Sequence, residues 1–372
     1  MGRGTVEPLK VIVWTTGPVG RMAVRHVLDR PDMTLVGVKA YSADKHGRDV
    51  GDLVRRERTG VIATGNDEEL LALDADCVLF CPNDSSMADP SVEGTQAHEH
   101  LLTILELLRS GKNVVSMHCG GTHPGSMRNR AWFEDVVGQA CRAGNSSLHF
   151  TGVDPGFVTD SLPIMLASIE GHVRQITTWE VLDYLRVDTH RSMYKLGFGR
   201  SPAEMDADRH GWIVQTWGGV PHLLAEAFGI ALEGIEVETE FWLTPDRIVA
   251  PNGYVVEPGT IAGYYFAQHG MHRGRRVFST KHINRFGPDS FPDKLQIGHD
   301  GGYRVEIDGR VPIAVDIPLG NPGGFGSAFS DAGISGAARM VNMAWPVVRA
   351  EPGYRTALDL TAPRSALLVD KG

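Results

Sequence analysis

Two glycines stand three positions apart, directly after the first apolar run of the chain, residues 9–14. A glycine at such a turn lets the backbone approach a phosphate closely, and a helix that starts there offers free N–H groups and a positive dipole. Thr15 stands where the full fingerprint has its first glycine, so the motif is partial. Its place between a buried strand and a helix predicts a dinucleotide-phosphate site, although an ordinary strand-to-helix turn is the alternative. The predicted residues are Thr16, Gly17, Pro18, Val19, Gly20 and Arg21.

The end of the second expected strand, residues 34–38, indicates which nicotinamide cofactor binds. NAD-preferring sites place an acidic residue there for the ribose hydroxyls, whereas the 2′-phosphate of NADP requires cations and hydroxyls. Residues 38–42 contain no acid, and Ser42, Lys45 and Arg48 follow closely. We therefore expect NADP, with NAD as the alternative. The other interpretation is that Lys45 and Arg48 are solvated loop charges.

Two further loops follow strands of the same expected sheet. Ligands of open α/β sheets bind outside the carboxyl ends of the strands. Pro82 and Asn83 follow the strand at 77–81, so they line the nicotinamide ribose or merely form a helix-capping loop. His118 and Cys119 follow the strand at 113–117.

His118 is the first candidate for the catalytic proton donor, because its imidazole titrates near neutral pH. His123 is the second histidine of this loop, and Cys119 is a candidate nucleophile or a replacement proton donor. Ordinary polar loop residues are the alternative reading of all three. Their spacing matches no zinc pattern, so we predict no metal site.

Strands and helices alternate over residues 9–151, which predicts a doubly wound parallel sheet of the Rossmann type. Further strands are expected at 60–63 and 148–151, and helices at 22–31, 95–109 and 130–143. From residue 173 the pattern changes to β-branched and aromatic alternation, which predicts an α+β domain on a mostly antiparallel sheet. Its strands are expected at 173–186, 235–243, 247–250, 259–269, 277–286 and 302–307. Residues 319–333 are expected to form a loop, and residues 335–348 a helix.

These patterns divide the chain into three parts. We expect a dinucleotide-binding domain at 1–155, a substrate domain at 156–332, and a C-terminal helical segment at 333–372. Asp154 is expected to cap the following helix, with a place in the substrate cleft as the alternative. An anionic substrate would select Arg186, Arg191 or Lys195, while His210, Trp212 and Trp217 mark another polar and aromatic stretch.

Composition excludes several classes of protein. The chain has 372 residues and a net charge of −9, which argues against a nucleic-acid binder and against attraction to anionic membranes. No apolar run is long enough to span a bilayer, and residues 1–10 lack the apolar core of a secretion signal. The four cysteines match no zinc or disulfide pattern. We expect a cytoplasmic protein with reduced thiols.

Several segments together carry a resemblance to a known family. The turn at 17–22 resembles the start of dihydrodipicolinate reductases. The longer pattern is similar to 2,4-diaminopentanoate dehydrogenases and native amine dehydrogenases. The matching segments are residues 45–51 (KHGRDVG), 151–157 (TGVDPGF), 196–199 (LGFG) and 341–346 (VNMAWP), which spread over nearly the whole chain.

The resemblance implies a Rossmann domain, dimerisation through the second domain at 156–332, and a C-terminal helix within 333–372 that returns to the first domain. It also implies a nicotinamide cofactor, with Asn342 on the cofactor side. Two departures bear on the reaction. The His-His-x-x-Lys signature of dihydrodipicolinate reductases is absent, and residues 117–123 lack the glutamate expected of the amine dehydrogenases. We expect an NADP-dependent oxidoreductase, a homodimer, that transfers a hydride to or from a C–N or C–O bond of a small organic substrate. A non-catalytic NADP-binding sensor or regulatory subunit is the alternative.

Overall fold

A computed structural model describes residues 7–81, 89–117, 121–187, 190–205, 209–320 and 327–365. The chain forms two compact units. The first combines Met1–Gly152 with Ile334–Gly372, and the second is Val153–Gly333. None of the described helices combines the length and the apolarity needed to cross a bilayer.

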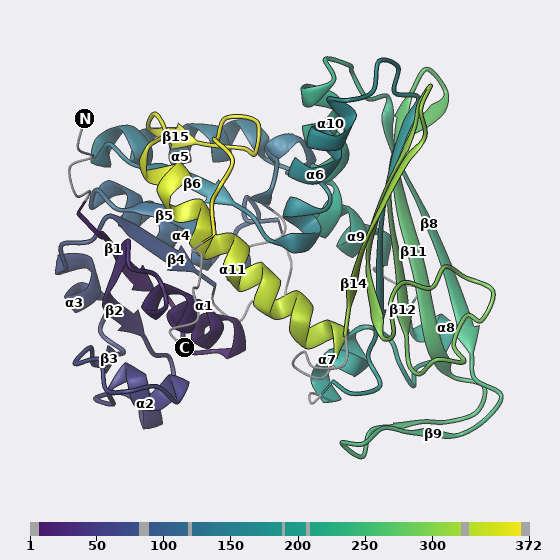
Figure 1. Cartoon of the computed structure of the whole chain (residues 1–372), viewed down its shortest axis with the longest axis horizontal. Coiled ribbons are helices and arrows are strands. Elements are labelled where there is room, and N and C mark those ends of the chain that lie inside the picture. Colours follow the sequence, from purple (N-terminus) through teal and green to yellow (C-terminus); the bar gives the residue numbers. More distant parts are fainter. Residues whose placement is uncertain are drawn as a thin grey trace, which may run out of the picture. The chain divides into compact units, whose positions relative to one another are not determined.

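The first unit is built on a seven-stranded sheet in the order β15-β6-β5-β4-β1-β2-β3, and every pair of neighbours runs parallel (Figure 1). Its strands are β1 (Leu9–Val13), β2 (Met33–Lys39), β3 (Ala63–Thr64), β4 (Cys77–Phe80), β5 (Asn113–Ser116), β6 (Ser147–Phe150) and β15 (Gly353–Tyr354). The strand order reverses between β1 and β4, so the carboxyl ends of these two strands form the switch point where such sheets bind ligands.

Helices flank the sheet because its strands are apolar on both sides. They are α1 (Pro18–Leu28), α2 (Val50–Val54), α3 (Asp67–Ala72), α4 (Gln96–Arg109) and α5 (Arg130–Gly144), with short 3-10 turns η1 (Ala43–Lys45) and η3 (Pro124–Ser126). One core packs α1 and the later half of α11 (Ala328–Val348) against one side of the sheet, and a second core packs α4 and α5 against the other. The predicted Rossmann sheet is confirmed.

The second unit carries a six-stranded sheet in the order β14-β13-β7-β12-β11-β8. Its strands are β7 (Gln175–Asp183), β8 (Gly234–Leu243), β11 (Ile261–His272), β12 (Arg275–Arg285), β13 (Gly301–Asp308) and β14 (Ile313–Leu319), and β9 (Ile248–Val249) pairs with β10 (Val255–Val256) apart from it. The sheet is mostly antiparallel, as predicted. The exception is β7, expected as an antiparallel strand, which runs antiparallel to β13 but parallel to β12.

Helices of the second unit cover one face of this sheet. They are α6 (Ser161–Ala167), α7 (His190–Lys195), α8 (Pro202–Met205), α9 (Arg209–Trp217) and α10 (Gly219–Ala227), preceded by the irregular turn η4 (Val153–Phe157). Residues of α6, α9 and α10 pack on inward-facing strand residues such as Ile176, Phe266 and Phe278. The same three helices lie along one side of the sheet in Figure 1.

The loop expected at residues 319–333 is shorter than predicted. Helix α11 begins at Ala328, because the Ser327 hydroxyl accepts a hydrogen bond from the backbone N–H of Ser330 at 3.2 Å. Such a cap satisfies an N–H group that would otherwise lack a partner in the first turn of the helix. The cap at Ser327 therefore starts the helix at Ala328, before the start at residue 335 that the sequence pattern predicts.

Candidate functional site

The turn between β1 and α1 has the geometry of a phosphate site. Gly17 is the N-cap of α1, with extended backbone angles of φ −67° and ψ 179°, and Pro18 occupies the first helical position. No side chain in the described part of the chain hydrogen-bonds as a cap at this end of α1. The N–H groups of the first helical turn and the positive end of the helix dipole thus remain able to bind an anion.

The two glycines are required for different reasons. A Cβ atom on Gly20 would lie 2.4 Å from both Cγ2 and the carbonyl oxygen of Thr15, so α1 can pack against the end of β1 only with glycine there. A Cβ atom on Gly17 would meet only Oγ1 of Thr15, at 3.5 Å, an ordinary contact. Among the described residues, Gly17 is therefore not needed for packing, and the space at its Cα can accommodate a ligand.

Thr15 explains how the turn forms without the first glycine of the fingerprint. Its side chain is buried, and its Oγ1 accepts a hydrogen bond from the N–H of Gly17 at 3.1 Å. The hydroxyl therefore fixes the turn from inside. The first glycine of the fingerprint would allow a tight turn through its conformational freedom. Thr15 holds the turn instead through a local hydrogen bond.

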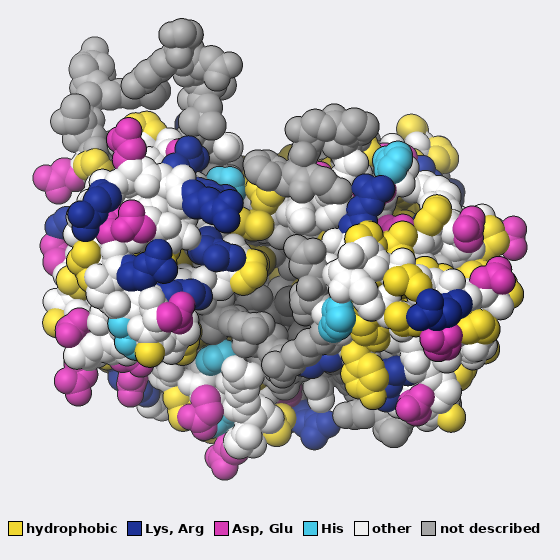
Figure 2. All heavy atoms as spheres, turned by 90° about the horizontal axis from the view of Figure 1, so that it is seen from below, with side chains coloured by type: hydrophobic (Ala, Val, Ile, Leu, Met, Phe, Trp, Pro, Cys, Tyr) yellow, Lys and Arg dark blue, Asp and Glu magenta, His cyan; other side chains and the backbone are white. Residues whose placement is uncertain are grey.

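The loop after β2 reaches this turn through one side chain. Nζ of Lys45 donates a hydrogen bond to the carbonyl oxygen of Thr16 at 3.4 Å, which places a cation beside the turn. Ser42 and Arg48, the other two residues predicted to hold a 2′-phosphate, are exposed in the same loop, and Arg21 is exposed on α1. Lys39 is engaged elsewhere, by Asp67 and the carbonyl of Gly65. Figure 2 shows Lys and Arg side chains gathered on the lower face of the first unit, where α2 and β3 lie in Figure 1.

Four predicted residues lie outside the described part of the chain: Pro82, Asn83, His118 and Cys119. Their assignments stay predictions. His123 is described, and its role is local: Nδ1 accepts a hydrogen bond from the N–H of Gly125 at 2.9 Å, and the side chain is buried.

Asn342 is not brought to the cofactor turn. Its Oδ1 accepts a hydrogen bond from Nη1 of Arg30 at 2.7 Å. Arg30 follows the C-terminal end of α1, whereas the turn lies at the N-terminal end. The 11 residues of α1 separate the two ends by about 16 Å.

A second group of polar residues gathers in the second unit, at a place that sequence reasoning missed. The carboxylate of Asp154 accepts hydrogen bonds from Nε2 of His282 at 3.0 Å and from Nε1 of Trp217 at 2.8 Å. The side chains of Asp154 and His282 are each only 1% exposed. The expectation that Asp154 caps the next helix is wrong, because Asp160 caps α6 by accepting from the N–H of Ser161.

Aromatic rings hold the imidazole of His282 in place. Phe266 stacks on it with ring centroids 4.4 Å apart and 15° between the planes, and Trp217 packs against it, tilted by 53°, with centroids 4.4 Å apart. The amide of Gln268 donates to the carbonyl oxygen of Trp217 and so fixes the end of α9. Nδ1 of His282 is buried and has no hydrogen-bond partner among the described residues.

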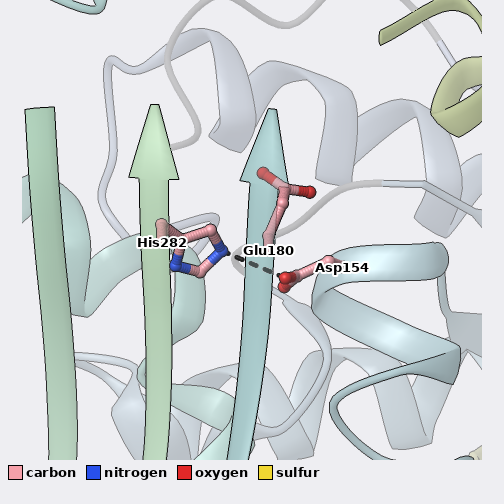
Figure 3. A group of neighbouring side chains, drawn as sticks. All are labelled: Asp154, Glu180 and His282. Carbon is pink, nitrogen blue, oxygen red and sulfur yellow. Dashed lines mark hydrogen bonds and ion pairs between the residues drawn. The ribbon is translucent and has the colours of Figure 1, made fainter. Parts of the chain in front are cut away.

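Glu180 completes this group, which we call the Asp–Glu–His cluster (Asp154, Glu180 and His282; Figure 3). Pairing between strands places Tyr303, Glu180, His282 and Phe266 in one row across β13, β7, β12 and β11. A ligand atom from each member of the cluster lies within 4.8 Å of the others. In Figure 3 a dashed line joins His282 to Asp154 and none reaches Glu180.

The surroundings of Glu180 change its pKa. Burial and, after it, the nearby Asp154 carboxylate raise the pKa of Glu180 well above its ordinary value, and a smaller hydrogen-bonding effect of Tyr303 lowers it. Burial, followed by the negative charge of Glu180, also raises the pKa of Tyr184 and of Tyr303. A carboxyl group with a raised pKa holds a proton more tightly than an ordinary carboxyl group does.

One alternation in the sequence could have revealed this cluster. Ile176, Thr178 and Leu182 are buried and share with Glu180 the face of β7 that packs against helices. An acidic residue at an inward-facing strand position is uncommon unless it has a function or a partner. The pattern does not indicate which distant residues meet it.

Known proteins resemble the chain over nearly its whole length. The family model of the 2,4-diaminopentanoate dehydrogenase C-terminal domain matches residues 157–371, more than half of the chain. An amine dehydrogenase of Streptomyces virginiae is 31% identical over 359 residues, which are 95% of this chain and 96% of the relative. A 2,4-diaminopentanoate dehydrogenase of Acetoanaerobium sticklandii is 23% identical, over 97% of this chain and 96% of that protein.

A solved structure shows the same fold. The amine dehydrogenase from Mycobacterium smegmatis superposes with a TM-score of 0.73 at 18% sequence identity, covering 96% of this chain and 97% of that one. The family model and the Streptomyces relative confirm the predicted family resemblance. On the family model and the Streptomyces relative, the chain belongs to the 2,4-diaminopentanoate dehydrogenase and amine dehydrogenase family of NAD(P)-dependent oxidoreductases.

Proposed function

We propose that this chain is an NADP-preferring oxidoreductase that acts on the C–N bond of a small organic amine. The observation that carries the proposal is the turn of β1 and α1, with Gly17 at an uncapped helix start and Lys45 beside it. The relatives named amine dehydrogenase and 2,4-diaminopentanoate dehydrogenase support the C–N bond as the reacting group. A bound nicotinamide would supply the chemistry of hydride exchange at the carbon that carries the nitrogen.

The residues of the turn fit a dinucleotide. The free space at Gly17 accommodates the pyrophosphate, the first-turn N–H groups of α1 bind its oxygens, and Arg21 adds a cation at the surface. Lys45, with the exposed Ser42 and Arg48, supplies the charges and hydroxyl that a 2′-phosphate requires. No described carboxylate forms an ion pair with Lys45 or Arg48, so both charges remain available to the phosphate.

We assign the cofactor to the first unit and the substrate to the second, and we propose that the protein is a cytoplasmic homodimer. Helices α6, α9 and α10 cover one face of the second sheet, and no described helix packs on the residues of the opposite face that surround Val181 and Ile283. Trp179 and Lys281 are half-buried on that face, with Lys281 over the indole ring at 4.5 Å. Light scattering should give a molar mass twice that of one chain, and a monomer at micromolar concentration would contradict the dimer.

The reaction can be tested in the reductive direction. NADPH oxidation is followed at 340 nm with a panel of small ketones, each with and without ammonium chloride. Turnover that requires both ketone and ammonium supports the proposal. Turnover with ketone alone indicates carbonyl reduction, the alternative that the absence of a carboxylate in residues 117–123 favours. Tight NADPH binding without turnover of any ketone in the panel indicates the other alternative, a non-catalytic NADP-binding sensor or regulatory subunit.

A further inference from the structure

Glu180 has an electrostatic environment unlike that of the other two members of the Asp–Glu–His cluster. Both oxygens of Asp154 accept hydrogen bonds, one from Trp217 and one from His282. Glu180 forms no ion pair with any described lysine or arginine, and the residues acting on it are Asp154, a like charge, and the hydroxyl-bearing Tyr303. It is also half-buried, so water screens it only in part.

A carboxylate in that position is stabilised by a cation or by a proton. A divalent metal ion is the less suitable occupant, because it would displace the donors that already hold both oxygens of Asp154 and would require Nε2 of His282 without its proton. An ammonium group requires neither change, because it can donate N–H bonds to Glu180 while the Asp154 pairings persist.

The surroundings of the cluster suit the organic part of such a cation. Phe266 and Trp217 enclose the imidazole of His282, and Tyr303 and Tyr184 flank Glu180. Aromatic faces attract ammonium groups and provide apolar surface for an alkyl chain next to the charge. A carboxylate with no lysine or arginine partner among the described residues, set among aromatic rings, can accept hydrogen bonds from a primary ammonium group.

We propose that Glu180 binds the ammonium group of the substrate and accepts a proton from it. This inference rests on the proposed function and supplies the carboxylate that residues 117–123 lack. An O–H bond forms on Glu180 as an N–H bond of the ammonium group breaks, and the electron pair stays on nitrogen as the lone pair of the neutral amine. That lone pair is needed before the C–N bond can gain double-bond character.

The other cluster residues position this step. Asp154 orients the ring of His282 through Nε2, and the row of strand pairs fixes Glu180 between His282 and Tyr303. The raised pKa of Glu180 reduces the difference in proton affinity between its carboxylate and an amine, which favours transfer. The titratable groups around Glu180 are Asp154, His282, Tyr184 and Tyr303. Of these, Asp154 raises the pKa of Glu180 and Tyr303 lowers it.

Binding can be measured without cofactor and without turnover. n-Propylammonium chloride is titrated into the protein at constant ionic strength while tryptophan fluorescence is recorded, because the Trp217 indole donates to Asp154 within the cluster. We expect a saturable signal that W217F removes and that E180Q weakens at least about tenfold. The matched control is E306Q, on β13, whose carboxylate accepts from Trp179 and which should bind propylammonium as the wild type does. Tetramethylammonium, which has no N–H group, should give no comparable signal.

The effect on turnover is expected in kcat and in its pH dependence. E180Q should lower kcat for amine oxidation by about 10²-fold or more, with NADPH affinity unchanged. The wild-type rate should rise with pH as Glu180 ionises, and E180Q should lose this limb of the profile. E180D, which keeps the charge but withdraws it by one methylene, should retain a weakened propylammonium signal and the pH limb. If E180Q fails to fold, E180D still tests the role of the Glu180 carboxylate.

The outcomes separate this inference from the proposed function. Amine turnover in which E180Q keeps the wild-type kcat, pH profile and propylammonium affinity would overturn the role of Glu180 and leave the proposed function intact. If the protein binds NADPH but oxidises no amine, the proposed function is contradicted. The propylammonium titration then still tests whether Glu180 binds an ammonium group. A response to Zn²⁺ or Mg²⁺ with none to propylammonium would overturn the site in favour of a metal centre.

Discussion

Gly20→Ala is expected to lower the stability of the protein, whereas Gly17→Ala is expected to weaken cofactor binding and leave stability nearly unchanged. At Gly20 the new methyl group would lie 2.4 Å from two atoms of Thr15, one of them a backbone oxygen that cannot rotate away. Helix α1 must then move from the end of β1. Overpacking of this kind costs about 1–3 kcal/mol. In a domain of this size, each kcal/mol lowers Tm by about 2–4 °C.

At Gly17 the same methyl group would meet only Oγ1 of Thr15, at 3.5 Å. Its φ of −67° suits any residue, and the loss of a glycine N-cap costs less than about 1 kcal/mol. The methyl group would instead occupy the space that we assign to the pyrophosphate. We therefore expect Gly17→Ala to retain a Tm close to that of the wild type and to weaken NADPH binding at least about tenfold, or ~1.4 kcal/mol.

The assay compares both variants with the wild type. Thermal unfolding without cofactor measures stability, and titration of NADPH followed by its fluorescence measures affinity. A Gly20→Ala protein as stable as the wild type would show that Thr15 does not hold α1 as described. Unchanged NADPH affinity in Gly17→Ala would show that the pyrophosphate does not lie over this turn, and the cofactor assignment would have to be withdrawn.

Three further predictions concern single side chains. Lys45→Ala should lower NADPH affinity by about 10- to 100-fold, because a charge-assisted hydrogen bond to the 2′-phosphate is lost. NADH affinity should stay unchanged, and competition binding measures both affinities. Equal losses for NADPH and NADH would refute the NADP preference. Asp154→Ala should cost roughly 3 kcal/mol of unfolding free energy in urea, because buried donors of His282 and Trp217 lose their acceptor, whereas Asp154→Asn should cost less. Burial lowers the pKa of His149 to about 4, so the folded state keeps it neutral while the unfolded chain binds a proton below its ordinary value of 6.5. Stability should therefore fall by on the order of 3 kcal/mol between pH 6.5 and pH 4, and His149→Asn should flatten this dependence; an equal slope in both proteins would contradict it.

The first unit could be predicted well because its signals are local. Buried runs such as residues 77–80 and the leucines of α4 show their periodicity within a few positions. The second unit was predicted less completely. Helices α6 to α10 are short, and β14 is an edge strand with alternating exposure and a proline, so neither gives a strong pattern. The parallel pairing of β7 with β12 depends on residues about a hundred positions apart, which no local pattern encodes.

The two candidate sites differ in the same way. Gly17, Gly20 and Lys45 lie within thirty residues, and strand-turn-helix logic brings them together. The hydrogen bond between Asp154 and His282 spans 128 positions, and the local preference of aspartate for helix caps led to the wrong role for Asp154. Asn342 was assigned through family likeness alone, and a tertiary contact with Arg30 places it at the other end of α1.

The division of the first unit between the two ends of the chain has a consequence for its synthesis. Met340, Val341 and Val347 of α11 belong to the same core as β1 and β2, and β15 extends the sheet beside β6. These residues leave the ribosome only after the whole second unit. The nascent chain must therefore carry an incomplete Rossmann core, with one flank of apolar side chains uncovered, while more than 180 residues are translated. Chaperone demand should then peak late in translation, and stop codons placed before α11 should yield aggregates rather than a smaller cofactor-binding protein.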